Sequence, residues 1–299
     1  MKQTLQQLTL PQLRRRAEEE SAGLPALMAA AQRAAQSVLT GEHAQRKSGA
    51  GEKFWQFREY DPTDRPQDID WRQSGKGDRI FVRQKERQTM QTALFWCAGG
   101  AGMDYSSTPS SPTKHESAAV LTLALAIMMR HAGEQIGLLD GSSPPGKSDH
   151  TLQVIGHSLL KKSDENYPRS KQIPDNAGVV LCGDFLDPPE TIDMIVSPLA
   201  ARAGSGIIIQ TLDPAEIDLP FTGRAIFENM GGAERHHIFL VESIKDSYQK
   251  RIGEHLREIK NICRKAGWYW ILHRTDRPVR ETLADVWMMT DHEQFNAVT

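Results

Sequence analysis

After residue 91, short apolar segments alternate with longer segments that carry a helical pattern, and this alternation constrains the fold more than any other feature. We expect strands near residues 92–97, 135–139, 178–182, 206–211, 237–241 and 268–273, and helices near 115–132, 189–203, 246–266 and 279–288. Such alternation is typical of a mostly parallel sheet with helices on both faces. The sequence therefore predicts an α/β domain over residues 92–290.

Two shorter regions precede this domain. Residues 1–39 are predicted to form an N-terminal helical segment, because Leu27, Ala31 and Ala35 recur at helical spacing. Residues 40–91 are rich in glycine, charge and aromatic side chains. Their alternating segments KFWQF and RIFVRQ are typical of strands. We therefore expect a small β-rich module between the helix and the α/β domain.

Charge and cysteine content exclude several classes of protein. The net charge is −2, and basic and acidic residues are interspersed, so we expect no nucleic-acid partner. The three cysteines are far apart and outside any CxxC pattern, which favours neither a disulfide framework nor a zinc site. The apolar stretch at residues 118–129 is too short to span a bilayer. We expect a cytoplasmic protein without a membrane span.

The loop AGGAGMDYSS at residues 98–107 directly follows the first apolar strand. It therefore falls at the carboxyl ends of the strands, where open α/β sheets bind ligands. The loop contains neither the GxxxxGK[ST] nor the GxGxxG pattern, and the next predicted helix begins only near His115. Its glycines thus lie too far upstream of that helix to form a phosphate-binding site with the helix N-terminus. We predict no nucleotide and no other cofactor.

Other chemically suggestive residues have structural interpretations. The segments DPPE (Asp187 to Glu190) and DPAE (Asp213 to Glu216) are typical of capping boxes, in which Asp is the N-cap and Glu the third helical residue. Cys97 and Cys182 each end a predicted strand and are expected to be inert thiols. The doublet His236–His237 is interpreted as a strand entry. No catalytic arrangement of serine or cysteine with histidine emerges, so we expect a protein that is not an enzyme.

The densest group of charged and aromatic residues lies at residues 51–86. Arginines and aspartates alternate closely there, which favours a network of Arg–carboxylate hydrogen bonds in an irregular loop. Acids nearly cancel bases, whereas binding of nucleic acid requires a net positive charge. A hydrolase that uses acids of residues 59–70 stays an alternative, although nothing selects two of these acids over the others.

The block GEHAQRKSGAGEKFWQFREYDPTDRPQDIDWR at residues 41–72 resembles the domain-of-unknown-function 58 family. The segments IFVRQKE, GLLDG, VVLCGDFLDP, QTLDPAEIDLPFTG and KAGWYWILHRTD follow in the order that the family uses, so the resemblance covers about residues 39–290. We interpret these residues of the block as a partner-binding or structural signature: Arg58, Tyr60, Asp64, Asp68, Asp70, Trp71 and Arg72.

Members of this family resemble von Willebrand factor A domains, so the resemblance implies a von Willebrand A-like sheet that acts through protein–protein interaction. In many members an Asp-x-Ser-x-Ser-Met motif after the first strand binds a divalent cation. Here Ala98 replaces the aspartate, and Gly100 and Gly102 replace the two serines, whereas Met103 is retained. Asp184 matches a later aspartate of the family site. Alanine and glycine have no side-chain oxygen for a hard cation, so we expect a degenerate site without metal.

The family is commonly encoded beside MoxR-type AAA+ ATPases. The resemblance therefore implies a non-enzymatic adaptor or scaffold that works with a MoxR-type AAA+ ATPase and a client protein. The alternative from another class is a divalent-metal-dependent binding module that uses residual ligands such as Asp184.

Overall fold

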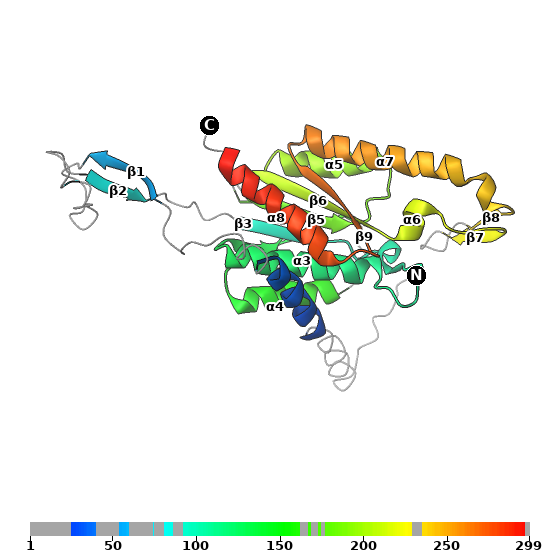
Figure 1. Ribbon diagram of the computed structural model, residues 1–299, viewed down its shortest axis with the longest axis horizontal. Helices are drawn as coiled ribbons and strands as arrows, with labels where there is room; N and C mark the ends of the chain where they lie inside the picture. Colours follow the sequence, from blue (N-terminus) through cyan, green and yellow to red (C-terminus); the bar gives the residue numbers. More distant parts are fainter. Residues whose placement is uncertain are drawn as a thin grey trace, which may run out of the picture. The chain divides into compact units, whose positions relative to one another are not determined.

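The computed structural model describes residues 25–39, 54–59, 74, 81–85, 92–161, 167–168, 173–174, 177–228 and 235–296 (Figure 1). These residues belong to two compact units. One unit joins the helix at residues 25–39 to residues 92–296, and the other holds the strands β1 (Phe54–Glu59) and β2 (Phe81–Lys85). The two strands pair antiparallel, so the alternating segments KFWQF and RIFVRQ correctly predict strands.

A parallel sheet forms the centre of the larger unit. Its strands are β3 (Thr92–Cys97), β4 (Gln135–Leu138), β5 (Gly178–Gly183), β6 (Ser205–Leu212) and β9 (Tyr269–Arg274). They are arranged in the order β4-β3-β5-β6-β9, and every pairing in this sheet is parallel. The central strands are buried on both faces, which explains why they are continuous apolar runs. The predicted α/β class with a parallel sheet is confirmed.

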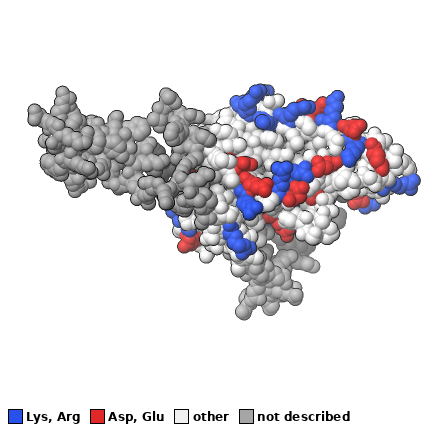
Figure 2. All heavy atoms as spheres, in the orientation of Figure 1, with Lys and Arg blue, Asp and Glu red and all other residues white. Residues whose placement is uncertain are grey.

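Helices cover both faces of this sheet (Figure 1). They are α3 (Lys114–His131), α4 (Asp149–Leu160), α5 (Pro189–Ala200), α7 (Lys245–Lys265) and α8 (Val279–Asn296). Figure 1 shows α3 and α4 on one face and α5 and α7 on the other. Lysines and arginines are interspersed with acids on the described surface seen in Figure 2.

Two helices follow the sequence pattern closely. Helix α3 is buried along most of its length, as expected for a helix that is apolar on all sides. Helix α7 buries Ile259, Ile262 and Cys263, and Gly267 follows its end with a φ of 68°, the left-handed conformation that favours glycine. In the part of the chain that the structure describes, no helix combines the length and apolar character needed to cross a bilayer.

The helix at residues 25–39 packs onto the α/β domain. Leu27, Ala31 and Ala35 are buried in the same apolar cluster as the strands and α3. Their spacing places them on one face of the helix. The predicted N-terminal helix is therefore present in this region and contributes to the main core.

Several elements differ from the sequence prediction. The strand expected at 237–241 is β8 (Arg235–Ile238), which pairs antiparallel with β7 (Ala225–Glu228) outside the parallel sheet. The next two residues, Phe239 and Leu240, are 74% and 54% exposed, so their apolar character does not reflect a buried strand. Helix α4 was not predicted, although Leu152, Ile155 and Leu159 are buried at helical spacing.

The strand order changes direction beside β3. The chain leaves β3 toward β4 on one side, and the later strands β5, β6 and β9 add on the other side. Helices α3 and α5, which follow β3 and β5, lie on opposite faces (Figure 1). Open α/β sheets bind ligands at such a switch point, outside the carboxyl ends of the strands. The loops after β3, β5 and β6 meet there.

Candidate functional site

The loop after β3 and the start of the loop after β5 lie against each other. The backbone N–H of Ala98 donates to the carbonyl of Cys182 at 2.8 Å. Gly100 precedes the short 3-10 helix η2 (Ala101–Asp104), in which Met103 is buried. A Cβ atom on Gly102 would lie 3.1 Å from Oδ2 of Asp184. The structure therefore brings Gly102 and Asp184, two positions of the expected degenerate site, into direct proximity.

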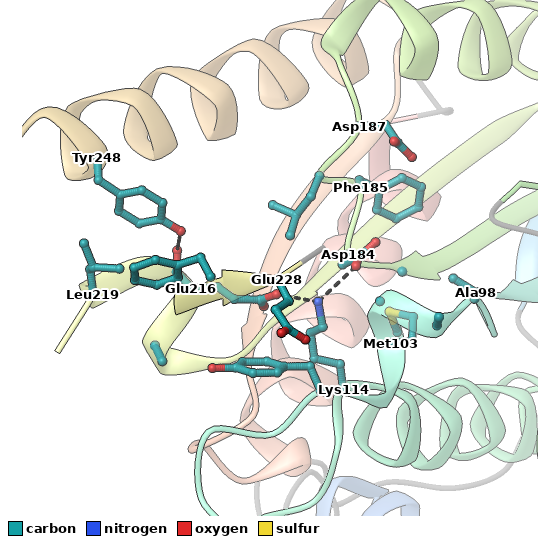
Figure 3. Close-up of a pocket in the computed structure, with 18 of the residues that line it drawn as sticks. Ala98, Met103, Lys114, Asp184, Phe185, Asp187, Glu216, Leu219, Glu228 and Tyr248 are labelled. Atoms are coloured by element: carbon teal, nitrogen blue, oxygen red, sulfur yellow. Dashed lines mark hydrogen bonds and ion pairs between the residues drawn. The ribbon is translucent and has the colours of Figure 1, made fainter. Parts of the chain in front are cut away.

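A buried lysine that sequence reasoning missed occupies the centre of this site. Lys114 is the first residue of α3, and its side chain is 1% exposed. Its Nζ atom lies 3.0 Å from Oδ2 of Asp184 and 2.6 Å from Oε1 of Glu216 (Figure 3). Burial of an ammonium group is costly unless the group is paired and hydrogen-bonded. The two carboxylates provide that pairing.

Glu216 belongs to the short helix α6 (Pro214–Asp218) and has two roles. Its Oε2 atom accepts from the backbone N–H of Asp213 at 2.9 Å, and the side chain of Asp213 accepts from Ala215 N–H at 2.8 Å. The capping box predicted for DPAE is therefore confirmed. The remaining oxygen, Oε1, accepts from Lys114. Burial raises the pKa of Glu216, and the nearby Lys114 ammonium opposes that rise.

A buried glutamine positions the backbone of Asp184. Nε2 of Gln210 on β6 donates to the carbonyl of Asp184 at 2.8 Å. The next residue, Phe185, has a φ of 46°, which is uncommon for a residue with a side chain. Its carbonyl lies 2.7 Å from Nε2 of His255. Surrounding contacts thus stabilise a strained backbone next to Asp184, a situation that is common at functional sites.

The second residue of α3, His115, contacts the start of the loop after β3. The ring of His115 is buried, with Nδ1 3.0 Å from the carbonyl of Ala98 and Nε2 2.8 Å from the carbonyl of Leu159 at the end of α4. The backbone N–H of Ser107, at the far end of the same loop, donates to Oδ2 of Asp213 at 2.9 Å. The loop is therefore fixed at both ends.

A cavity of about 1110 Å³ opens above these residues. Its lining includes the acids Asp184, Asp187, Glu216 and Glu228, together with Lys114 and several aromatic and aliphatic side chains. Figure 3 shows the Lys114 ammonium between Asp184 and Glu216, with Asp187 farther out beyond Phe185. The rim is apolar: Leu186 is 38% exposed, Phe221 37% and Ile226 54%. The cavity thus combines an acidic lining with an apolar rim.

The residues present do not fit the divalent cation that the family resemblance implies. Ala98, Gly100 and Gly102 offer no side-chain oxygen, and a hard cation requires about six oxygen ligands. The two nearby carboxylates already accept from the Lys114 ammonium. Among the residues that the structure describes, no group of three His, Cys, Asp or Glu side chains could hold a metal ion.

The capping box predicted for DPPE is wrong, although the helix begins in this segment. Helix α5 has Pro188 as its N-cap, and no side chain caps its first turn. Oδ2 of Asp187 instead accepts from the hydroxyl of Tyr167, and Asp187 lines the cavity. The pattern alone could not show this, because a tyrosine about 20 residues upstream competes for the same carboxylate.

The remaining sequence candidates lie away from the cavity or outside the described residues. Cys97 and Cys182 are register partners on β3 and β5, and burial raises the pKa of both thiols. His236 and His237 lie on β8 with exposed side chains. Of the signature residues, Arg58 lies in β1, where only the backbone is described. The others lie outside the described residues: Tyr60, Asp64, Asp68, Asp70, Trp71 and Arg72.

Comparison with known families agrees with the signature. The family described as "Protein of unknown function DUF58" matches residues 56–259. The chain belongs to the DUF58 family. This DUF58 chain is 20% identical over 268 residues to an uncharacterized protein of Mycobacterium bovis and to one of Mycobacterium tuberculosis strain H37Rv, covering 83% of this chain and 82% of each relative. No solved structure matches it.

Proposed function

We propose that this DUF58 protein is a non-enzymatic adaptor or scaffold that works with a MoxR-type AAA+ ATPase and a client protein. The observation that carries the proposal is the cavity of about 1110 Å³ at the carboxyl ends of the strands. Its rim exposes Leu186, Phe221 and Ile226. Apolar side chains exposed around a large concavity are typical of surfaces that another protein covers.

The polar groups of the cavity support recognition rather than turnover. Lys114 pairs with Asp184 and Glu216, and Glu216 also caps α6. Burial raises the pKa of Tyr248 to about 12, so its hydroxyl stays protonated and donates to the Glu216 carbonyl at 2.6 Å. These groups stabilise one another, whereas catalysis requires groups that are available to a substrate.

A von Willebrand A-like domain and a cytoplasmic location are part of the same proposal. The five parallel strands and the change in strand order beside β3 support the von Willebrand A-like domain. Three free cysteines, at positions 97, 182 and 263, support the cytoplasmic location, because thiols persist in reducing compartments.

Co-purification tests the proposal. Tagged protein isolated from its native cell with a slowly hydrolysed ATP analogue should retain an AAA+ ATPase, identified by mass spectrometry. Ile226→Asp should reduce that recovery at least fivefold, because it places a charge on the apolar rim. Met194→Asp is the matched control, since Met194 is 70% exposed on α5 and does not line the cavity. Absence of any AAA+ ATPase, or equal losses from both variants, would contradict the proposal.

The charge of the lining predicts the chemistry of the partner. Four carboxylates line the cavity, and the described residues give them two cationic partners: Lys114 for Asp184 and Glu216, and Arg235 for Glu228 at 2.8 Å. We therefore expect the docked segment to be basic. Asp187→Asn combined with Glu228→Gln should weaken ATPase recovery, and the loss should shrink as salt rises. The exposed acid Asp193 on α5 gives the control Asp193→Asn, which should leave recovery unchanged.

A further inference from the structure

Lys114 brings together carboxylates from two different strand ends. Asp184 directly follows β5, and Glu216 lies in the helix that follows β6. Both carboxylates are partly buried, with side chains 25% and 18% exposed, whereas the lysine side chain is 1% exposed. Two ionised carboxylates that are close enough to contact the same atom repel each other unless a cation lies between them. The only cation that the described residues place in contact with both is the Lys114 ammonium.

We propose that the Lys114 ammonium takes the place of a divalent metal ion at the carboxyl ends of the strands. The ammonium lies between Asp184 and Glu216, reduces their mutual repulsion and fixes their orientation, so the floor of the cavity is organised without metal. Where the inference concerns docking of a partner, it rests on the proposed function. Its central claim concerns the isolated protein: lysine and a divalent ion exclude each other.

The neighbouring glycine supports this exclusion. The Oδ2 atom of Asp184 that accepts from Lys114 is also the atom 3.1 Å from a Cβ placed on Gly102. The ammonium therefore binds the face of Asp184 that lies beside the loop after β3. A hard cation prefers oxygen ligands at about 2.1 to 2.6 Å and would have to displace the ammonium from this oxygen. Restoring ligands on the loop alone should not be sufficient.

Calorimetric titration with MnCl₂ and MgCl₂ tests the exclusion on purified protein. We expect no binding tighter than about 1 mM for the wild type or for the triple variant Ala98→Asp, Gly100→Ser, Gly102→Ser. Adding Lys114→Ala to the triple variant should tighten binding at least tenfold. The proposal is overturned if the triple variant alone binds either ion tighter than about 1 mM, or if removal of Lys114 changes nothing.

A second substitution guards against the possibility that the Lys114→Ala variant does not fold. Lys114→Gln keeps a hydrogen-bond donor but removes the charge, so it replaces Lys114→Ala if circular dichroism shows that the alanine variant is unfolded. The triple variant retains Lys114 and tests the proposal by itself, since metal binding to this variant would contradict the proposal. No ATPase is present in these titrations, so their failure is distinguishable from failure of the co-purification.

Discussion

Replacing Lys114 with methionine should lower the free energy of unfolding by about 3 kcal/mol, because it leaves two partly buried carboxylates without their cation. Methionine has a similar length and fills the space of the lysine stem, so the effect reports on charge more than on packing. Urea denaturation at neutral pH measures it. Lys250→Met on the exposed side of α7 is the matched control and should change stability by less than about 0.5 kcal/mol.

The pH dependence of the same variant distinguishes lost charge from lost packing. Burial already raises the pKa of Glu216, and Lys114 opposes the rise, so removal of Lys114 should raise that pKa further. A group whose pKa is higher in the folded than in the unfolded state makes the folded protein more stable as pH falls. The deficit of Lys114→Met relative to the wild type should therefore be smaller at pH 5 than at pH 8. An equal deficit at both values would indicate that lost packing, not charge, dominates.

The architecture around this site could be predicted largely from local sequence patterns. Strands β5 and β6 are continuous apolar runs because helices cover both faces, and such runs are visible without a structure. The capping box at Asp213 was also predictable, since it depends on residues three apart. The strand at Arg235–Ile238 was placed in the wrong sheet, because an apolar run does not show which strand it pairs with.

The centre of the site could not be predicted in the same way. A lysine at the first position of a helix is usually solvated. Burial of Lys114 is favourable only because it pairs with Asp184 and Glu216, which lie 70 and 102 residues later in the sequence. Glu216 was fully explained by its cap, which uses one carboxylate oxygen and leaves the other for Lys114. Contacts between residues far apart in sequence thus determine the site, whereas local patterns determine the elements that carry it.

A buried histidine away from the cavity gives the protein a second pH-dependent feature. His273 on β9 is 1% exposed. Its Nε2 atom lies 2.9 Å from the hydroxyl of Ser117 on α3, and its Nδ1 atom lies 2.8 Å from the hydroxyl of Thr282 on α8. Burial lowers the pKa of His273 from 6.5 to about 4, although Asp276 acts in the opposite direction. The neutral ring therefore links three elements of the core.

Acidification should destabilise the protein through His273. Because its pKa is lower in the folded state, the unfolded chain binds the proton more tightly, so stability is unaffected above about pH 7 and falls as pH drops from 6.5 toward 4. At pH 5 the loss should be about 2 kcal/mol. His273→Gln cannot take up this proton, so the stability difference between wild type and variant in urea should shrink by that amount between pH 8 and pH 5. The exposed His150→Gln should show no such change, and a constant difference for His273→Gln would mean that the buried ring does not titrate in this range.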